Sequence, residues 1–110
     1  MSMTFGGYEF SDPVRIDRWD PPYRAGVYAV LRPDYSHTPP YAVIYFGQSS
    51  NMSERGFVKS HHRYSCFVST ARAEPNLYIA AHFMPNSTED QRHQVEAWLI
   101  DWYNPICNRT

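Results

Sequence analysis

The sequence lacks long apolar runs and a strong excess of charge of either sign. No apolar stretch approaches the length of about 20 residues that a membrane-spanning helix needs, and we therefore expect no contact with a membrane. Ten Lys and Arg residues against eleven Asp and Glu residues give a formal charge of −1. This balance excludes a protein that coats nucleic acid through bulk positive charge.

Cysteine is also scarce. The two cysteines, Cys66 and Cys107, lie far apart and outside any Cys-x-x-Cys or Cys/His spacing. This pattern argues against a disulfide framework and against a structural zinc site. The N-terminus has neither the basic head nor the apolar core of a signal peptide. Together these features predict a reducing, cytoplasmic location.

What is present is typical of one folded domain. The 110 residues are 43% hydrophobic and 16% aromatic, which supports a single ordinary core and excludes a disordered chain. Nine of the ten basic residues are arginine, and the guanidinium fork of arginine suits contacts with phosphate or carboxylate.

The first 24 residues are rich in turn formers and charged residues. They predict an irregular arm with one short extended piece, which packs on the rest of the chain through Phe10, Ile16 and Trp19. The remaining residues, 25–110, then form the main domain.

Three segments rich in β-branched and aromatic residues predict strands, at residues 25–31, 41–47 and 76–83. Because the first two are joined by a proline-rich loop, we expect them to pair antiparallel. With the helices described next, this order predicts an α+β fold with a small three-stranded antiparallel sheet flanked by helices.

Two segments favour helix. Residues 51–54 resemble a helix entry, with an Asn cap followed by Glu three residues later, and the helix beyond Gly56 is left open. The strongest helical pattern covers residues 88–102. Its apolar face, which we expect to be buried, contains Gln91, Val95, Trp98, Leu99 and Trp102.

Strand alternation brings two phenols together. In the first strand Val27, Ala29 and Leu31 share one face and Tyr28 the other; in the second, Ala42, Ile44 and Phe46 share a face and Tyr45 lies opposite. If both apolar triplets line one core, Tyr28 and Tyr45 emerge on the same face of the sheet.

Arg55 follows Tyr45 by ten residues, and Glu96 lies one position off the apolar face of the last helix. A phenol pair, an arginine and a carboxylate suit phosphodiester cleavage. The arginine and a metal ion neutralise the phosphoryl oxygens, while a phenol takes a proton from water. By themselves these residues equally fit ordinary packing, and Glu96 equally fits an ion pair with Arg92 four residues earlier.

The ordered set resembles the signature of the GIY-YIG nuclease superfamily. It comprises Gly26-Val27-Tyr28, Tyr45-Phe46-Gly47, Arg55, Glu96 and Asn108. The resemblance covers about residues 25–108. It implies a three-stranded antiparallel sheet flanked by helices, and one divalent cation, Mg²⁺ or Mn²⁺, held by a single glutamate.

The resemblance also implies roles for these residues. Glu96 is expected to be the metal ligand and Arg55 the clamp on the phosphate. Tyr28 and Tyr45 would position or deprotonate the attacking water, and Asn108 would brace the site by hydrogen bonding.

One departure concerns the position four residues after Arg55, where many members carry His or Tyr and this chain has Lys59. His61 and His62 follow. If a helix continues through this segment, Arg55, Lys59 and His62 share one face, which favours His62 over His61 as the aid to the general base. A break at Gly56 would remove that argument, so the choice among Lys59, His61 and His62 stays open.

The resulting hypothesis is a metal-dependent endonuclease that hydrolyses DNA phosphodiester bonds, with structured or branched DNA among its candidate substrates and RNA not distinguished from DNA. Since the chain has no separate DNA-reading element, specificity would require a homodimer, a specificity subunit or recognition of DNA shape. The alternative is a weakly active or inactive module of the same kind that binds nucleic acid or a partner.

Overall fold

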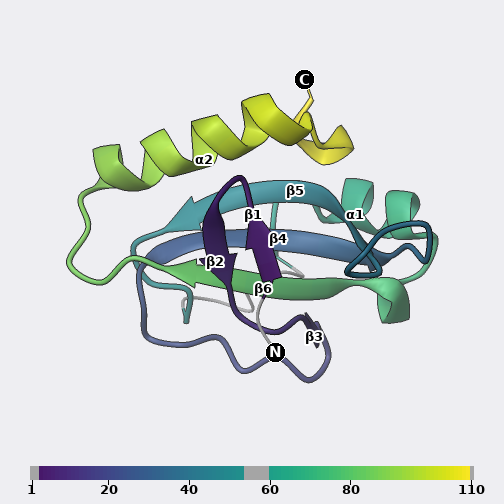
Figure 1. Ribbon diagram of the computed structural model, residues 1–110. Coiled ribbons are helices and arrows are strands. Elements are labelled where there is room, and N and C mark those ends of the chain that lie inside the picture. Colours follow the sequence, from purple (N-terminus) through teal and green to yellow (C-terminus); the bar gives the residue numbers. More distant parts are fainter. Residues whose placement is uncertain (1–2, 54–59, 110) are drawn as a thin grey trace.

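A four-stranded antiparallel sheet in the order β3-β6-β4-β5 forms the centre of the molecule (Figure 1). The computed structural model describes residues 3–53 and 60–109. Within them the elements are β1 (Met3–Phe5), β2 (Tyr8–Phe10), β3 (Val14–Arg15), β4 (Gly26–Pro33), β5 (Tyr41–Ser49), α1 (Tyr64–Ala71), the 3₁₀ turn η1 (Glu74–Asn76), β6 (Tyr78–Phe83), α2 (Glu89–Tyr103) and the 3₁₀ turn η2 (Ile106–Asn108).

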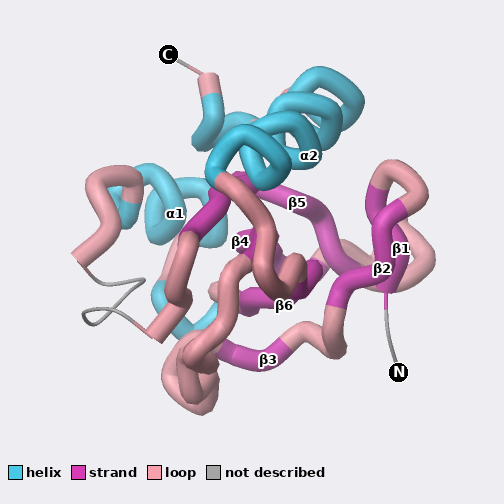
Figure 2. Tube along the Cα trace, turned by 90° about the vertical axis from the view of Figure 1, so that its left-hand side faces the viewer, coloured by secondary structure: helices cyan, strands magenta, loops and turns pink. Residues whose placement is uncertain are grey.

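The sheet is covered on both faces, and each face has its own apolar core (Figure 2). The hairpin β1–β2 and helix α2 cover one face, where Phe5, Phe46 and Leu99 are buried together. Helix α1 covers the other face, where Tyr28 and Phe67 belong to the buried cluster. The expected α+β class is therefore confirmed, but the sheet has four strands rather than three.

The N-terminal segment is more regular than the irregular arm that we predicted. Gly6 and Gly7 have φ angles of +56° and +88°, as a two-residue hairpin turn of the primed type requires, and they join β1 to β2. Strand β3 then adds to β6 at the edge of the sheet. The predicted packing is confirmed, since Phe10 is buried and Ile16 and Trp19 pack against the α1-side core.

A β-bulge changes the faces predicted for the second strand. Val30 pairs with Tyr45, but the next residue of β4 pairs with Val43, which leaves Ile44 as the extra residue. Ile44 therefore lies in the core under α1, while Phe46 lies in the core under α2. The prediction that these two side chains share a face was wrong. Tyr28 and Tyr45 nevertheless lie on one face, with ring centroids 6.1 Å apart.

Helix α2 confirms the strongest predicted helix but buries a different face. Thr88 caps it through a reciprocal pair of hydrogen bonds with Gln91. Its buried residues are Arg92, Val95 and Leu99. Trp98 and Trp102, which we expected in the core, are 49% and 63% exposed, because only a narrow stripe of the helix faces the sheet.

Among the residues that the structure describes, the first helix is α1 (Tyr64–Ala71). At the expected helix entry, residues 51–53 form a turn in which the Asn51 side chain accepts hydrogen bonds from the backbone and side chain of Ser53. Glu54 and the rest of that predicted helix lie outside the described residues. Helix α1 begins at Tyr64, in a segment for which the sequence pattern indicated no helix.

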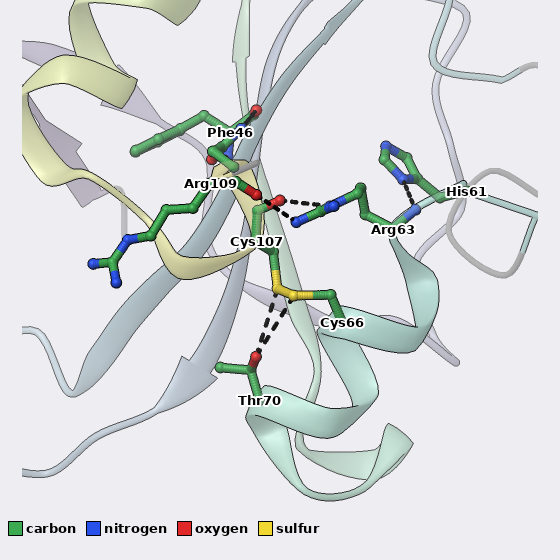
Figure 3. The surroundings of a disulfide bond; sticks show 8 residues. Phe46, His61, Arg63, Cys66, Thr70, Cys107 and Arg109 are labelled. Carbon is green, nitrogen blue, oxygen red and sulfur yellow. Dashed lines mark hydrogen bonds between the residues drawn. A yellow bond between two sulfur atoms is a disulfide. The ribbon is translucent and has the colours of Figure 1, made fainter.

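The two cysteines form a disulfide, which corrects the prediction against a disulfide framework. Cys66 on α1 bonds to Cys107 on η2, with the Cα atoms 5.8 Å apart, and the bridge ties α1 to the segment that follows α2 (Figure 3). In the described part of the chain, no helix has both the length and the apolar character needed to cross a membrane.

Glycine is required at position 47 because the backbone of β5 passes close to the phenol ring of Tyr28. Gly47 pairs with Tyr28 across β4 and β5, and a Cβ atom placed on it would overlap the phenol ring of Tyr28. Both residues are buried, so neither has open space into which to move.

We therefore expect Gly47→Ala to lower the free energy of unfolding by about 1–3 kcal/mol, the usual cost of overpacking. Chemical denaturation measures this value. In a Tyr28→Ala background, where the ring is gone, the same substitution should cost much less, because the two sites are coupled. Equal costs in both backgrounds would show that the ring does not constrain Gly47.

Candidate active site

Three side chains meet on the α1 side of the sheet, near the end of β5. Tyr28 comes from β4, Tyr45 from β5 and His61 from the turn before α1. The Tyr28 hydroxyl lies 2.9 Å from Nε2 of His61, and the His61 ring packs edge-on against Tyr45 with centroids 5.0 Å apart.

The backbone fixes the tautomer of His61. The amide N–H of Arg63 donates to Nδ1 of His61 at 3.0 Å, so Nδ1 is an acceptor without a proton. The neutral ring therefore carries its proton on Nε2, and His61 donates to the oxygen of Tyr28.

The hydrogen bond from His61 to Tyr28 also bears on the direction of the hydrogen bond between Tyr28 and Tyr45. A side-chain hydrogen bond between the two phenols raises the pKa of Tyr28 and lowers that of Tyr45, as expected when Tyr28, whose oxygen accepts from His61, donates its hydroxyl proton to Tyr45. Tyr45 is thus the last oxygen of a polarised chain that runs from His61 through Tyr28.

Burial dominates the ionisation of all three groups. It raises the pKa of Tyr28 far above the ordinary range, with the neighbouring Tyr45 and Glu96 adding to the effect. Burial and Glu96 together keep the pKa of Tyr45 raised despite the bond from Tyr28. The same cause, helped by His62 and Arg63, lowers the pKa of His61 to about 4. At neutral pH the site therefore holds two phenols and a neutral imidazole.

Glu96 supplies the negative charge of the site. It lies on α2, which packs against the edge strand β5, and it acts electrostatically on both phenols. Burial raises the pKa of Glu96, while His93, at 3.4 Å, and the backbone N–H of Gln48 oppose this by contacting the carboxylate. These contacts, from its own helix and from β5, favour the ionised carboxylate and so oppose the effect of burial.

Asn108 holds β5 in place. Its Oδ1 accepts from the backbone N–H of Phe46 at 2.8 Å, and its Nδ2 donates to the Phe46 carbonyl at 2.9 Å. The side chain thus replaces a strand partner at the outer edge of β5, one residue after Tyr45. This is the bracing role that the resemblance implied for it.

A surface pocket of about 330 Å³ opens beside Tyr45. Of the two phenols only Tyr45 lines it, whereas Tyr28 is buried behind. The lining residues are Tyr45, His62, Arg63, Cys107, Asn108 and Arg109. A ligand in this pocket would contact Tyr45, the last residue of the hydrogen-bond chain.

The structure brings together Tyr28, Tyr45, Glu96 and Asn108 of the predicted set. The preference for His62 over His61 was wrong for the contact with the tyrosines. Residues 60–63 are not helical, so the helical spacing behind that preference does not apply, and His62 is an exposed ring stacked on His61. The predicted clamp Arg55, and Lys59, lie outside the described residues.

Sequence reasoning missed two supporting residues, Arg63 and Arg92. Arg63 contacts His61 through its backbone, as described above. Arg92 is buried and donates to the side chain of Gln48 and to Ser87, so the considered ion pair of Arg92 with Glu96 is replaced by contacts that hold the end of β5 against α2. The only sequence signal for Arg92 was its position three residues before Val95, on the face that the helix buries.

The donor set at Glu96 suits a divalent cation held by few protein ligands. A partly buried carboxylate offers hard oxygen donors, and Mg²⁺ commonly binds through one or two carboxylates while it keeps several waters. Burial raises the pKa of this carboxylate, and a nearby cation would offset that cost. Over residues 3–53 and 60–109, no group of three or more His, Cys, Asp or Glu side chains could hold a metal ion.

Comparison of the chain with protein-family models, with curated proteins and with solved structures finds no match.

The lowered pKa of His61 predicts a loss of stability in acid. An unfolded histidine binds a proton near pH 6.5, but the folded ring resists it down to about pH 4. The free energy of unfolding should therefore fall between pH 6.5 and 4. The histidine should account for about 1–2 kcal/mol of the fall, an amount reduced for partial solvent exposure.

Denaturation of His61→Gln over this pH range should show a shallower fall than the wild type. His37→Gln is the matched control, because His37 is an exposed residue of the β4–β5 loop, close to Asp34. It should keep the slope of the wild type. An unchanged slope in His61→Gln would contradict the buried, neutral state of His61.

Proposed function

We propose that this protein is a metal-dependent endonuclease that hydrolyses phosphodiester bonds of DNA. The observation that carries the proposal is the directed chain from His61 through Tyr28 to Tyr45, which ends at an open pocket within electrostatic range of Glu96. Buried phenols that serve packing alone need neither a fixed direction of hydrogen bonding nor a carboxylate beside them.

Tyr45 is the residue suited to handle the attacking water. Tyr45 lines the pocket, and its oxygen receives the hydrogen bond from Tyr28, which acts to lower its pKa. Once the phenol has released its own proton to solvent, the phenolate would take the proton of the attacking water. Tyr28 is too deeply buried to meet a substrate and instead orients Tyr45. His61 donates to Tyr28, so it holds the direction of the chain rather than acting as a base.

Glu96 is the residue that would hold Mg²⁺ or Mn²⁺, and such a cation would supply positive charge for the phosphoryl oxygens. The carboxylate raises the pKa of both phenols, and neutralising its charge would favour proton acceptance by Tyr45. The clamp on the phosphate is assigned to Arg55 on the resemblance alone.

The partner proposed for this site is DNA, in structured or branched form among others, with specificity supplied by a homodimer or by a separate subunit. The alternative, a weakly active or inactive module that binds nucleic acid or a partner, predicts binding without cleavage. A cytoplasmic location stays a prediction, and the disulfide weighs against it because cytosolic thiols are normally kept reduced.

Glu96→Gln should abolish cleavage of supercoiled plasmid in Mg²⁺, by at least about 100-fold, because the amide keeps the shape but loses the charge that binds the cation. It should also remove any rise in melting temperature on adding Mg²⁺. The control is Glu89→Gln, an exposed residue of the same helix, which should cut normally. Cleavage by Glu96→Gln at the wild-type rate would overturn the metal assignment.

Tyr45→Phe should lose far more rate than Tyr28→Phe. Removing the proton acceptor should cost about 100- to 10,000-fold, whereas removing the Tyr28 hydroxyl deletes one supporting hydrogen bond and should cost about tenfold. Single-turnover plasmid cleavage measures both rates, and DNA affinity should change little in either variant. A larger loss in Tyr28→Phe would reverse the two roles.

A further inference from the structure

The disulfide and Arg63 tie together the two segments that reach the tyrosine pair. The Cys66–Cys107 bridge joins α1 to η2. The Arg63 guanidinium reinforces the same junction, since its Nε donates to the Cys107 carbonyl at 2.7 Å and its Nη2 donates to the Arg109 carbonyl at 2.9 Å (Figure 3). Thr70 contacts both sulfur atoms.

The first segment leads from the bridge to Tyr45. Cys107 is followed directly by Asn108, whose side chain makes both hydrogen bonds to the backbone of Phe46. Phe46 is the neighbour of Tyr45 in β5. A displacement of η2 would therefore release the edge of β5 at the residue next to the substrate-facing phenol.

The second segment leads from the bridge to Tyr28. Arg63 is the residue before α1 and lies three positions before Cys66. Its backbone N–H fixes the tautomer of His61, which in turn donates to Tyr28. A displacement of the start of α1 from η2 would therefore remove the group that directs the hydrogen-bond chain.

We propose that the Cys66–Cys107 disulfide and Arg63 form a clamp that positions Tyr28 and Tyr45, so that reduction of this disulfide by a dithiol lowers the activity of the site. The activity in question is the cleavage proposed above, on which this part of the inference rests. Arg63 is a positioning residue, because its contacts act on the tyrosines through His61 and η2.

The redox step is an ordinary exchange with a dithiol reductant. Cys107 is fully buried and Cys66 is partly exposed, so a thiolate of the reductant reaches the Cys66 sulfur first. It forms a mixed disulfide and releases Cys107 as a thiolate. The second thiol of the reductant then displaces Cys66, and the reductant leaves as a disulfide. The protein gains two electrons and two protons and ends with two thiols.

The first test needs no substrate and uses the full chain. Imidazole ¹⁵N chemical shifts report which nitrogen of His61 carries the proton. In the oxidised protein we expect the Nε2–H form alone, and after anaerobic treatment with dithiothreitol a mixture of tautomers. Unchanged His61 shifts after complete reduction would overturn the clamp. Complete unfolding on reduction, seen by circular dichroism, would also overturn it, because the bridge would then hold the whole domain rather than the site.

The second test is single-turnover plasmid cleavage in Mg²⁺. Reduction should lower the rate at least tenfold, and reoxidation should restore it. The variant Cys66→Ser/Cys107→Ser should have the low rate with or without dithiothreitol. A rate that does not respond to reduction would contradict the proposal. If no form of the protein cleaves DNA, the proposed nuclease fails, whereas the His61 shifts still decide whether the clamp exists.

Arg63 is tested in the oxidised protein. Arg63→Gln should lower the cleavage rate and broaden the tautomer signal of His61, and Arg63→Lys should restore part of both by keeping one cationic donor for the carbonyls. Arg18→Gln is the matched control, because Arg18 is an exposed arginine of the N-terminal segment. Equal losses in Arg63→Gln and Arg18→Gln would show that only general positive charge matters, and would remove Arg63 from the clamp.

Discussion

The contact of the Tyr28 ring with Gly47 is the constraint on which the rest of the site depends. Strand pairing sets these residues opposite each other, and only a residue without a side chain leaves room for the phenol. The ring then lies over β5 and brings its hydroxyl to His61 and Tyr45. This single steric requirement thus explains why a buried tyrosine and a strand glycine occur together. It also explains why the Tyr28 hydroxyl has a fixed place in the hydrogen-bond chain from His61 to Tyr45.

Much of the fold followed from local patterns. β-Rich segments gave β4, β5 and β6, and the turn chemistry before residue 89 gave α2, because these elements satisfy their own propensities. The Gly6-Gly7 hairpin was also readable, since two adjacent glycines between short apolar segments are a recognised turn signal. Strands of three residues on either side of it are too short for a pattern of alternation to predict. The bulge at Ile44 has no comparable signature, since it reflects how β5 fits β4 rather than any local preference.

The residues of the candidate site could be predicted where the prediction depends only on their order along the sequence. Tyr28, Tyr45, Glu96 and Asn108 were named from sequence and lie together around the end of β5. The choice between His61 and His62 required the backbone of residues 60–63, and the disulfide required the packing of α1 against η2. Both are long-range outcomes that spacing does not encode. The exposure of Trp98 has a similar origin, because its indole reaches the hairpin and donates to the Gly6 carbonyl instead of entering the core.

The dependence of β5 on Asn108 has a consequence for synthesis of the chain. The strand is complete by residue 49, but the amide that caps its outer edge and the sulfur that anchors α1 are added about 60 residues later. During vectorial translation the phenols are therefore made long before the groups that hold them. A nascent chain that lacks residues 106–108 therefore lacks the Asn108 contact with β5 and the Cys107 bridge to α1.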